Sequence, residues 1–264
     1  METWAGGVLN ERVTCRLCPN PGPMTLDGTN TWLLSAPGAD EAVVIDPGPL
    51  DEGHLQRALA DVAARGARVG LILATHGHWD HAESLERFVA LTGAPVRGNC
   101  PGAEPVSDGE VLEVGGLRLV AVPTPGHTMD SVCFRLEPDG ILFTGDTILG
   151  RGTTVVAHPD GHLGAYLESL DVIGGLVRDG LVTTLAPGHG PVRPDAGATV
   201  QEYVVHRAER LEQVREASRG QEDLTREDLA GAVVESVYAD VPREVWPAAR
   251  QSVLSQLDYL GLGR

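Results

Sequence analysis

Short apolar runs, separated by turn-forming residues, dominate the first third of the chain and predict buried β-strands. The runs at 31–34 and 42–45 flank a Pro-Gly turn and predict a β-hairpin. Residues 50–65 carry apolar side chains at helical spacing, and the continuous apolar run at 69–74 is typical of a buried strand. Together these segments predict a strand–helix–strand unit that ends directly before Thr75.

The middle of the chain continues the alternation of apolar runs and polar turns. An apolar stripe at 82–91 predicts a helix directly after a histidine-rich loop. Further strands are expected at 111–114, 117–122, 132–136 and 141–144. The polar clusters of this region each come directly after a predicted strand.

Helical periodicity dominates the last quarter of the chain. A charged segment at 197–219 keeps an apolar stripe and predicts one connecting helix. Thr225 is typical of an N-cap and predicts a helix that runs to Tyr238. A Val-Pro break at 241–242 then precedes a last helix over 246–260. This arrangement fits a small winged-helix-like or helical-hairpin module.

Length and composition fit one large domain with a small appendage. The chain has 264 residues, of which 42% are hydrophobic, enough to bury one large core. We expect a main domain over 1–196, a connecting helix over 197–221 and a C-terminal module over 222–264.

The charge and the chain's first residues narrow the setting in which the protein works. The formal net charge is -17 and all 20 basic residues are arginines, which disfavours tight nonspecific binding to nucleic acid or membranes. No cationic leader and no apolar run of about 18 residues is present, so we expect a cytoplasmic protein. Four scattered cysteines predict free thiols.

One short loop concentrates metal-binding chemistry. His76, His78, Asp80 and His81 place four imidazole or carboxylate donors within six residues, directly after an apolar strand. Alternate residues share a side, so His76 and His78 can face one metal while Asp80 and His81 turn toward a second. The loop therefore predicts two metal positions.

Three further donors follow strands, each directly after a glycine: His127, Asp146 and His189. A glycine lets the backbone turn sharply and approach a site closely. Taken singly, each loop fits a simple turn as well as a metal ligand.

Taken in chain order, His-x-His-x-Asp-His followed by Gly-His, Gly-Asp and Gly-His closely resembles the metallo-beta-lactamase superfamily, over residues 29 to about 194. The resemblance implies an α/β fold, an αββα sandwich of two mixed sheets flanked by helices, with the main domain catalytic. It also implies two metal ions, which we expect to be zinc, with manganese or iron as alternatives. The implied ligands are His76, His78 and His127 on the first metal, Asp80, His81 and His189 on the second, and Asp146 bridging both.

Such a site implies a hydrolase. Two cations about 4 Å apart bind a shared hydroxide, lower its pKa to near neutrality and polarise the group under attack. The nucleophile is then water, and we expect Asp80 and Asp146 to be essential to catalysis.

Longer stretches at 20–31, 145–153 and 187–192 look like the beta-lactamase-like-protein-2 group, whose studied members cleave single-stranded RNA. The tail at 224–260 is similar to that group's winged-helix-like module. Asp146 and the absence of a leader disfavour a lactam-hydrolysing role. The resemblance makes a single-stranded RNA phosphodiester the first substrate candidate.

Other substrates and roles stay open. The segment 222–264 holds eight acids against four arginines, a poor surface for gripping RNA. A thioester or other acyl hydrolase like hydroxyacylglutathione hydrolase, acting on a small molecule, is the alternative. A diiron redox protein or a non-catalytic binding protein is a third reading. Arg151 and Thr153, just beyond Asp146, are candidate substrate contacts, and the module is free either to cover the site or to pair two subunits as a homodimer.

Overall fold

The first of two β-sheets is built largely from the N-terminal part of the chain. The structure is a computed structural model that describes residues 3–221, 223–240 and 242–263. The strands run in sequence order across the sheet: β1 (Gly7–Val8), β2 (Val13–Leu17), β3 (Asn30–Leu34), β4 (Glu41–Ile45), β5 (Arg68–Leu73) and β6 (Val96–Arg97). The predicted hairpin is confirmed as the antiparallel pair β3–β4. Helix α1 (Glu52–Ala64) then carries the chain to β5, which pairs parallel to β4.

The second sheet holds the four later strands that the sequence predicts and one more. Its order is β11 (Thr184–Pro187), β10 (Ile141–Gly145), β9 (Val132–Glu137), β8 (Leu117–Pro123) and β7 (Val111–Val114). Strands β7 to β10 form an antiparallel meander, and β11 adds parallel to β10 after the long helix α4 (Leu163–Arg178).

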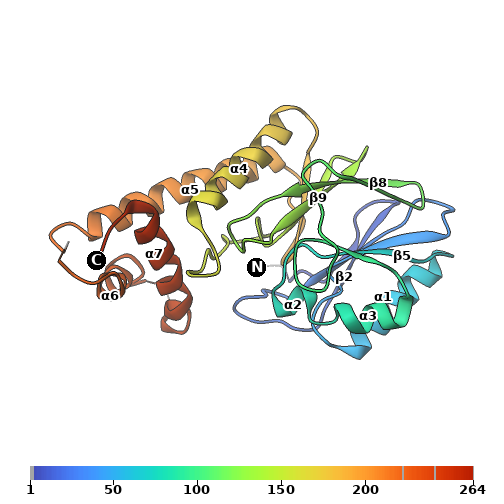
Figure 1. Cartoon of the computed structure of the whole chain (residues 1–264), viewed down its shortest axis with the longest axis horizontal. Helices are drawn as coiled ribbons and strands as arrows, with labels where there is room; N and C mark the ends of the chain where they lie inside the picture. Colours follow the sequence, from blue (N-terminus) through green and yellow to red (C-terminus); the bar gives the residue numbers. More distant parts are fainter. Residues whose placement is uncertain (1–2, 222, 241, 264) are drawn as a thin grey trace.

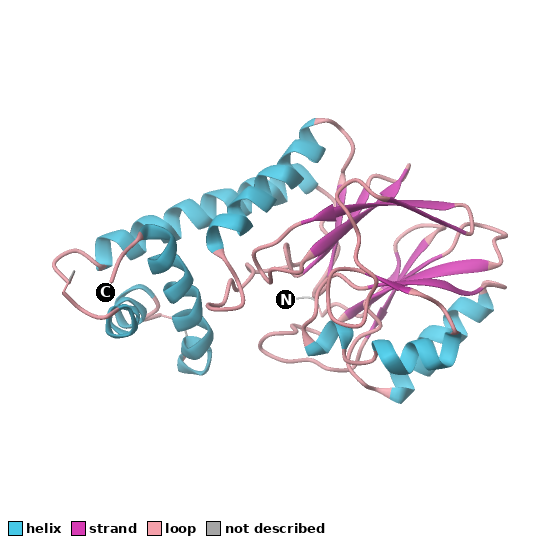
Figure 2. Cartoon of the chain, viewed as in Figure 1, coloured by secondary structure: helices cyan, strands magenta, loops and turns pink. Residues whose placement is uncertain are grey.

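The two sheets pack face to face and helices cover both outer faces, which confirms the expected αββα sandwich (Figure 2). Between the sheets lies an apolar layer in which Trp32 meets Phe143 edge to face, with ring centroids 5.6 Å apart. Helices α1 and α3 (Leu85–Thr92) cover the first sheet, through Leu55 and Phe88. Helices α4 and α5 (Ala196–Ala217) cover the second sheet.

The helix expected over 82–91 is divided into two. Helix α2 (Trp79–Ala82) carries the end of the histidine-rich loop, and α3 starts again at Leu85. The break is fixed at Ser84, whose hydroxyl and backbone N–H both donate to the Gly48 carbonyl. The Gly48 N–H in turn donates to the His81 carbonyl. The turn after β4 therefore sets the position of α2.

The C-terminal module is helical and lies at the far end of α5 from the sheets (Figure 1). Helix α6 (Arg226–Val237) begins at the predicted N-cap Thr225, and a 3-10 turn (Arg243–Val245) leads into α7 (Trp246–Leu260), as expected. Val214 of α5 packs into the same apolar cluster as α6 and α7, so α5 belongs to the core of the body and to that of the module. Glu222 and Val241, which the sequence analysis places at a module boundary and a chain break, lie outside the described residues.

The described residues also answer two of the compositional expectations. Cys15, Cys18, Cys100 and Cys133 are all buried free thiols. Within the described ranges, no helix is both long and apolar enough to cross a membrane.

Candidate metal centre

The seven predicted donors come together where several strands end at one edge of the sandwich. His76 follows β5, His127 follows β8, Asp146 follows β10 and His189 follows β11. The side-chain amide of Asn30 holds the last of these loops by donating to the carbonyls of Pro187 and Gly190.

Glycine is required in at least one ligand loop. Gly126, before His127, has φ +140°, and a Cβ there would lie 2.3 Å from the Cα of Tyr166. The loop therefore packs backbone to backbone against α4, and this contact fixes where His127 points.

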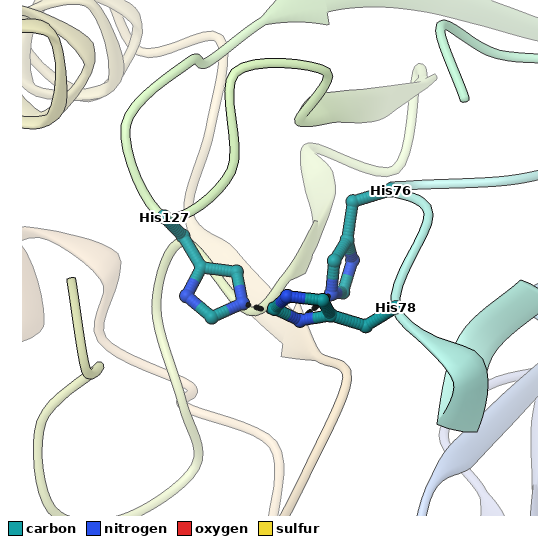
Figure 3. A group of neighbouring side chains, drawn as sticks. All are labelled: His76, His78 and His127. Atoms are coloured by element: carbon teal, nitrogen blue, oxygen red, sulfur yellow. Dashed lines mark hydrogen bonds between the residues drawn. The ribbon is translucent and has the colours of Figure 1, made fainter. Parts of the chain in front are cut away.

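The donors form overlapping groups whose ligating atoms lie within 4.8 Å of one another. We call His76, His78 and His127 site 1, and Asp80, His81 and His189 site 2; His76, His81 and Asp146 form a third group between them. In site 1 the imidazoles converge from two separate loops (Figure 3).

Hydrogen bonds on the outer side of the rings determine which nitrogen carries the proton. His127 Nδ1 lies 2.8 Å from the Val155 carbonyl, and His189 Nδ1 lies 3.1 Å from the Gly28 carbonyl. A carbonyl oxygen only accepts, so in neutral imidazoles these Nδ1 atoms carry the hydrogen. The Nε2 atoms of these two rings, which face the cluster, then carry a free lone pair, as metal ligation requires.

Asp46 performs the same task for two more histidines, and the sequence analysis did not identify it. Its Oδ2 accepts from His81 Nδ1 at 2.8 Å and from the Thr75 hydroxyl at 2.7 Å. The Thr75 hydroxyl is thereby left to accept from His76 Nδ1, 3.1 Å away. The available signal was an aspartate directly after the strand predicted at 42–45; its backbone φ of 51° is unusual for a non-glycine residue.

His78 has a more exposed outer partner. Its Nε2 lies 3.1 Å from Asp160 Oδ2, and both side chains are partly open to solvent. Its Nδ1 faces inward, 3.1 Å from His76 Nε2 and 3.1 Å from His127 Nε2. All five histidines therefore have an outer acceptor and an inward nitrogen.

The inward atoms fit cations. His81 Nε2 and His189 Nε2 are 3.2 Å apart, and lone pairs at such distances repel unless positive charge lies between them. Asp146 Oδ1 is buried without a hydrogen-bond partner in the described part of the chain, 3.5 Å from His81 Nε2, while Oδ2 lies 3.8 Å from His127 Nε2. One carboxylate thus faces both sites, as a bridging ligand would.

The electrostatics also call for positive charge. Burial alone would lower the pKa of His189, but the Asp146 and Asp80 carboxylates raise it to about 11. Burial alone would raise the pKa of Asp146, but His189 and His81 hold it well below its ordinary value. A proton on His189 thus fills the role that a cation fills once bound.

The two candidate substrate contacts are not part of this cluster. Arg151 pairs with Asp27 of the loop before β3, and this partner lowers the pKa of Asp27. Thr153 lines a separate cavity against the C-terminal module.

Family comparison identifies two segments. Residues 24–100 and 101–189 match the Metallo-beta-lactamase superfamily, and this span contains all seven donors. Residues 230–260 match the Beta-lactamase associated winged helix domain, which falls on α6 and α7.

Similar proteins carry different names. The Beta-lactamase-like protein 2 homolog of Caenorhabditis elegans is 35% identical, over 93% of this chain and 82% of the relative. The Atrochrysone carboxyl ACP thioesterase of Aspergillus chevalieri is 33% identical, over 94% of this chain and 80% of the relative. The solved structure of a metallo-beta-lactamase family protein from Thermus thermophilus superposes with a TM-score of 0.78 at 23% identity, over 96% of this chain and 94% of that one.

Proposed function

Because the chain belongs to the metallo-beta-lactamase superfamily and is a metal-dependent hydrolase, we propose that it uses two zinc ions to cleave an acyl thioester or ester. The observation that carries the choice of substrate is an apolar hollow beside the donor cluster. The competing candidate is the single-stranded RNA phosphodiester that the sequence analysis favours.

The donor chemistry supports zinc. Sites 1 and 2 offer imidazole nitrogens and carboxylate oxygens, a set that zinc prefers to harder ions such as magnesium. Metals bound there would supply activated water and a polarised carbonyl. The chain's own contribution is to hold the ligands in place: Asp46, Val155 and Gly28 fix the tautomers, and Asp146 spans the two sites.

The apolar hollow is a cavity of about 470 Å³ that adjoins the histidine-rich loop through Trp79. Its walls come from the loop before β3, from Trp79 and from the start of α7; they are Asn20, Pro21, Gly22, Pro23, Met24, Thr25, Trp79, Glu244, Val245, Pro247 and Ala248. Met24 and Trp79 are 54% and 60% exposed. Such walls suit an acyl chain or ring, because covering them removes apolar surface from water.

An RNA strand requires cationic side chains along its path. Two cavities near the donor cluster are instead lined in part by acidic side chains. Among the described residues that line the apolar hollow, one is charged, Glu244. Another cavity, of about 330 Å³, is lined by His78, Asp130 and Asp160. In these two cavities the carboxylates would repel the phosphates of an RNA strand but not an uncharged acyl group. The name of the Aspergillus chevalieri relative is consistent with this choice.

The test uses full-length, zinc-loaded protein with three probes: a short and a long acyl thioester of the same thiol, and a labelled single-stranded RNA. We expect about two zinc ions per chain by elemental analysis, and turnover that favours the longer acyl chain. Asp80→Ala should abolish turnover and lower the zinc content, whereas Asp40→Ala at an exposed position should alter neither. RNA cleavage without thioester turnover would replace this proposal with the phosphodiesterase, and iron with oxygen-reducing activity would refute both the metal and the reaction.

A further inference from the structure

A second cavity, of about 210 Å³, lies between the body and the C-terminal module. We call it the cationic cavity, because His206, Arg207 and Arg210 of α5 line it and, among the residues that the structure describes, no acidic one does. Facing them are Gln256 and Ser252 of α7. In a chain with a formal net charge of -17, a cavity with two arginines and no carboxylate is a local reversal of sign.

Three polar atoms of these residues have no hydrogen-bond partner within the described ranges: Arg207 Nε, Gln256 Oε1 and His206 Nδ1. Arg207 is 4% exposed and Gln256 3% exposed, so solvent does not readily compensate them. Leaving such buried groups without partners is costly, and native proteins generally satisfy them with protein, water or ligand. Three residues that line one cavity thus each carry an unpartnered polar atom, which favours a polar occupant.

The arginines are held in place from outside the cavity. Arg207 donates to the Thr154 carbonyl and stacks on the ring of Tyr166, 4.8 Å from its centroid. Arg210 lies 4.5 Å from the centroid of Tyr238. Both guanidinium groups are therefore fixed without a carboxylate partner at either contact, which leaves their charge for an anion.

The cavity is connected to the metal centre in two ways. Thr154 and Val155 line it, and the same two residues bond Asp146 and His127: the Thr154 hydroxyl donates to the Asp146 carbonyl, and the Val155 carbonyl accepts from His127. The cavity also shares Pro23 and Met24 with the apolar hollow. The two cavities are therefore neighbours, which is the arrangement that an elongated substrate reaching past Met24 would require.

We propose that the cationic cavity binds an oxyanion of the substrate, a carboxylate or a phosphate ester that lies away from the scissile bond. The oxyanion accepts from the guanidinium N–H groups of Arg207 and Arg210, and a hydroxyl or amide hydrogen beside it donates to the side-chain carbonyl of Gln256. This inference rests on the proposed acyl hydrolase activity for its catalytic consequence, but the binding itself does not.

Binding is tested by calorimetric titration of the zinc-loaded protein with inorganic phosphate, which carries both acceptor oxygens and a proton, and with sulfate, which lacks the proton. We expect phosphate to bind more tightly than sulfate, and Arg210→Gln to weaken phosphate binding by roughly tenfold to a hundredfold. Gln256→Leu should remove the preference for phosphate. Arg215→Gln, on the same helix but exposed and paired with Glu212, is the matched control. Equal phosphate affinity in all variants would place the anion on the metals and overturn the proposal.

Catalysis separates the two sources of the oxyanion. A glutaryl and a pentanoyl thioester of one thiol differ by a carboxylate in the acyl part, and phosphopantetheine and pantetheine thioesters differ by a phosphate in the thiol part. We expect one of these pairs to show a preference for the charged member that Arg210→Gln reduces by about tenfold. No preference in either pair overturns the assignment to substrate. Absence of any thioester turnover refutes the proposed function instead, and the phosphate titration then still decides whether the cavity binds an oxyanion.

Discussion

Asp46 and His81 form a buried carboxylate–imidazole pair, in which Asp46 Oδ2 accepts from His81 Nδ1 at 2.8 Å and neither residue is more than 1% exposed. The same carboxylate accepts from the backbone N–H and the hydroxyl of Thr75, at 2.8 and 2.7 Å. Because Thr75 also contacts His76, one side chain orients a ligand of each site.

Replacing Asp46 should therefore weaken metal binding at both sites of the proposed centre. Asp46→Asn removes the negative charge and substitutes an amide N–H₂ for one of the accepting oxygens. We expect zinc affinity to fall by about 10- to 100-fold, as is typical when the outer partner of a ligating histidine is lost. The measurement is competition with a chelator of known affinity. Asp40→Asn, an exposed change in the loop before β4, serves as the control. Unchanged zinc affinity in Asp46→Asn would show that the ring orientations do not depend on this carboxylate.

Gly188 packs directly against two of the donors, Asp146 and His81. A Cβ at this position would lie 2.6 Å from Asp146 Oδ1 and 2.6 Å from His81 Cε1. Gly188→Ala should therefore displace Asp146 and His81. We expect it to lower the free energy of unfolding by about 1–3 kcal/mol and to lower the zinc content. Denaturant unfolding and elemental analysis measure the two effects. The control is Gly231→Ala in α6, where nothing lies within 4 Å and a gain of up to about 1 kcal/mol is expected. Similar behaviour of the two variants would contradict the close approach.

Trp79 offers a test of the apolar hollow. Its ring lines the hollow, so Trp79→Ala should raise KM for a long acyl thioester by about tenfold and leave KM for an acetyl thioester within about twofold. Trp79→Phe should recover part of the loss. Zinc content must be measured alongside, because Trp79 stands between His78 and Asp80. Leu50→Ala, at another exposed apolar residue, is the control. An equal rise of KM for both substrates would argue against an acyl contact.

His54 predicts a pH dependence of stability. Its Nε2 lies 2.8 Å from the Thr31 hydroxyl, and burial, with Arg57 nearby, lowers the pKa of His54 to about 4. The unfolded chain binds a proton near pH 6.5, so the stabilisation from a neutral His54 is complete above that pH and is lost as the pH falls toward 4. Between pH 7 and pH 5 the loss is about 2 kcal/mol. Urea unfolding at both pH values should show a smaller loss for His54→Gln, and the same loss in both proteins would refute the assignment.

The sequence predicts the parts of this molecule that depend on local pattern. Seven strands, β3 to β5 and β7 to β10, the hairpin and the last helix follow from runs of apolar residues and from turn and cap signals, and the donors stand in loops directly after strands. The short strands β1 and β6 and the strands β2 and β11 were not predicted. The module's first helix begins at Thr225 because its hydroxyl caps the Asp228 N–H, an interaction contained within four residues.

What the sequence does not predict depends on contacts between distant segments. Asp46 is 35 residues from His81, and Arg151 is 124 residues from Asp27, so neither pairing leaves a local pattern. Helix α4 did leave a local pattern, with Leu163, Tyr166, Leu170 and Ile173 on its buried face, although no helix was predicted there. The cationic cavity requires α5 and α7 to meet, which only the packing of the module specifies.

The order of the donors along the chain also sets the order in which the two sites are completed during synthesis. All three residues of site 1 have been made once the ribosome passes His127, whereas site 2 waits for His189, 62 residues later, in the loop that Asn30 holds through Pro187 and Gly190. A nascent chain without β11 therefore already contains the three donors of site 1, whereas the donors of site 2 are complete only after β11 has been made. The two sites of the proposed metal centre thus become complete at different stages of synthesis, separated by the whole of β9, β10, α4 and β11.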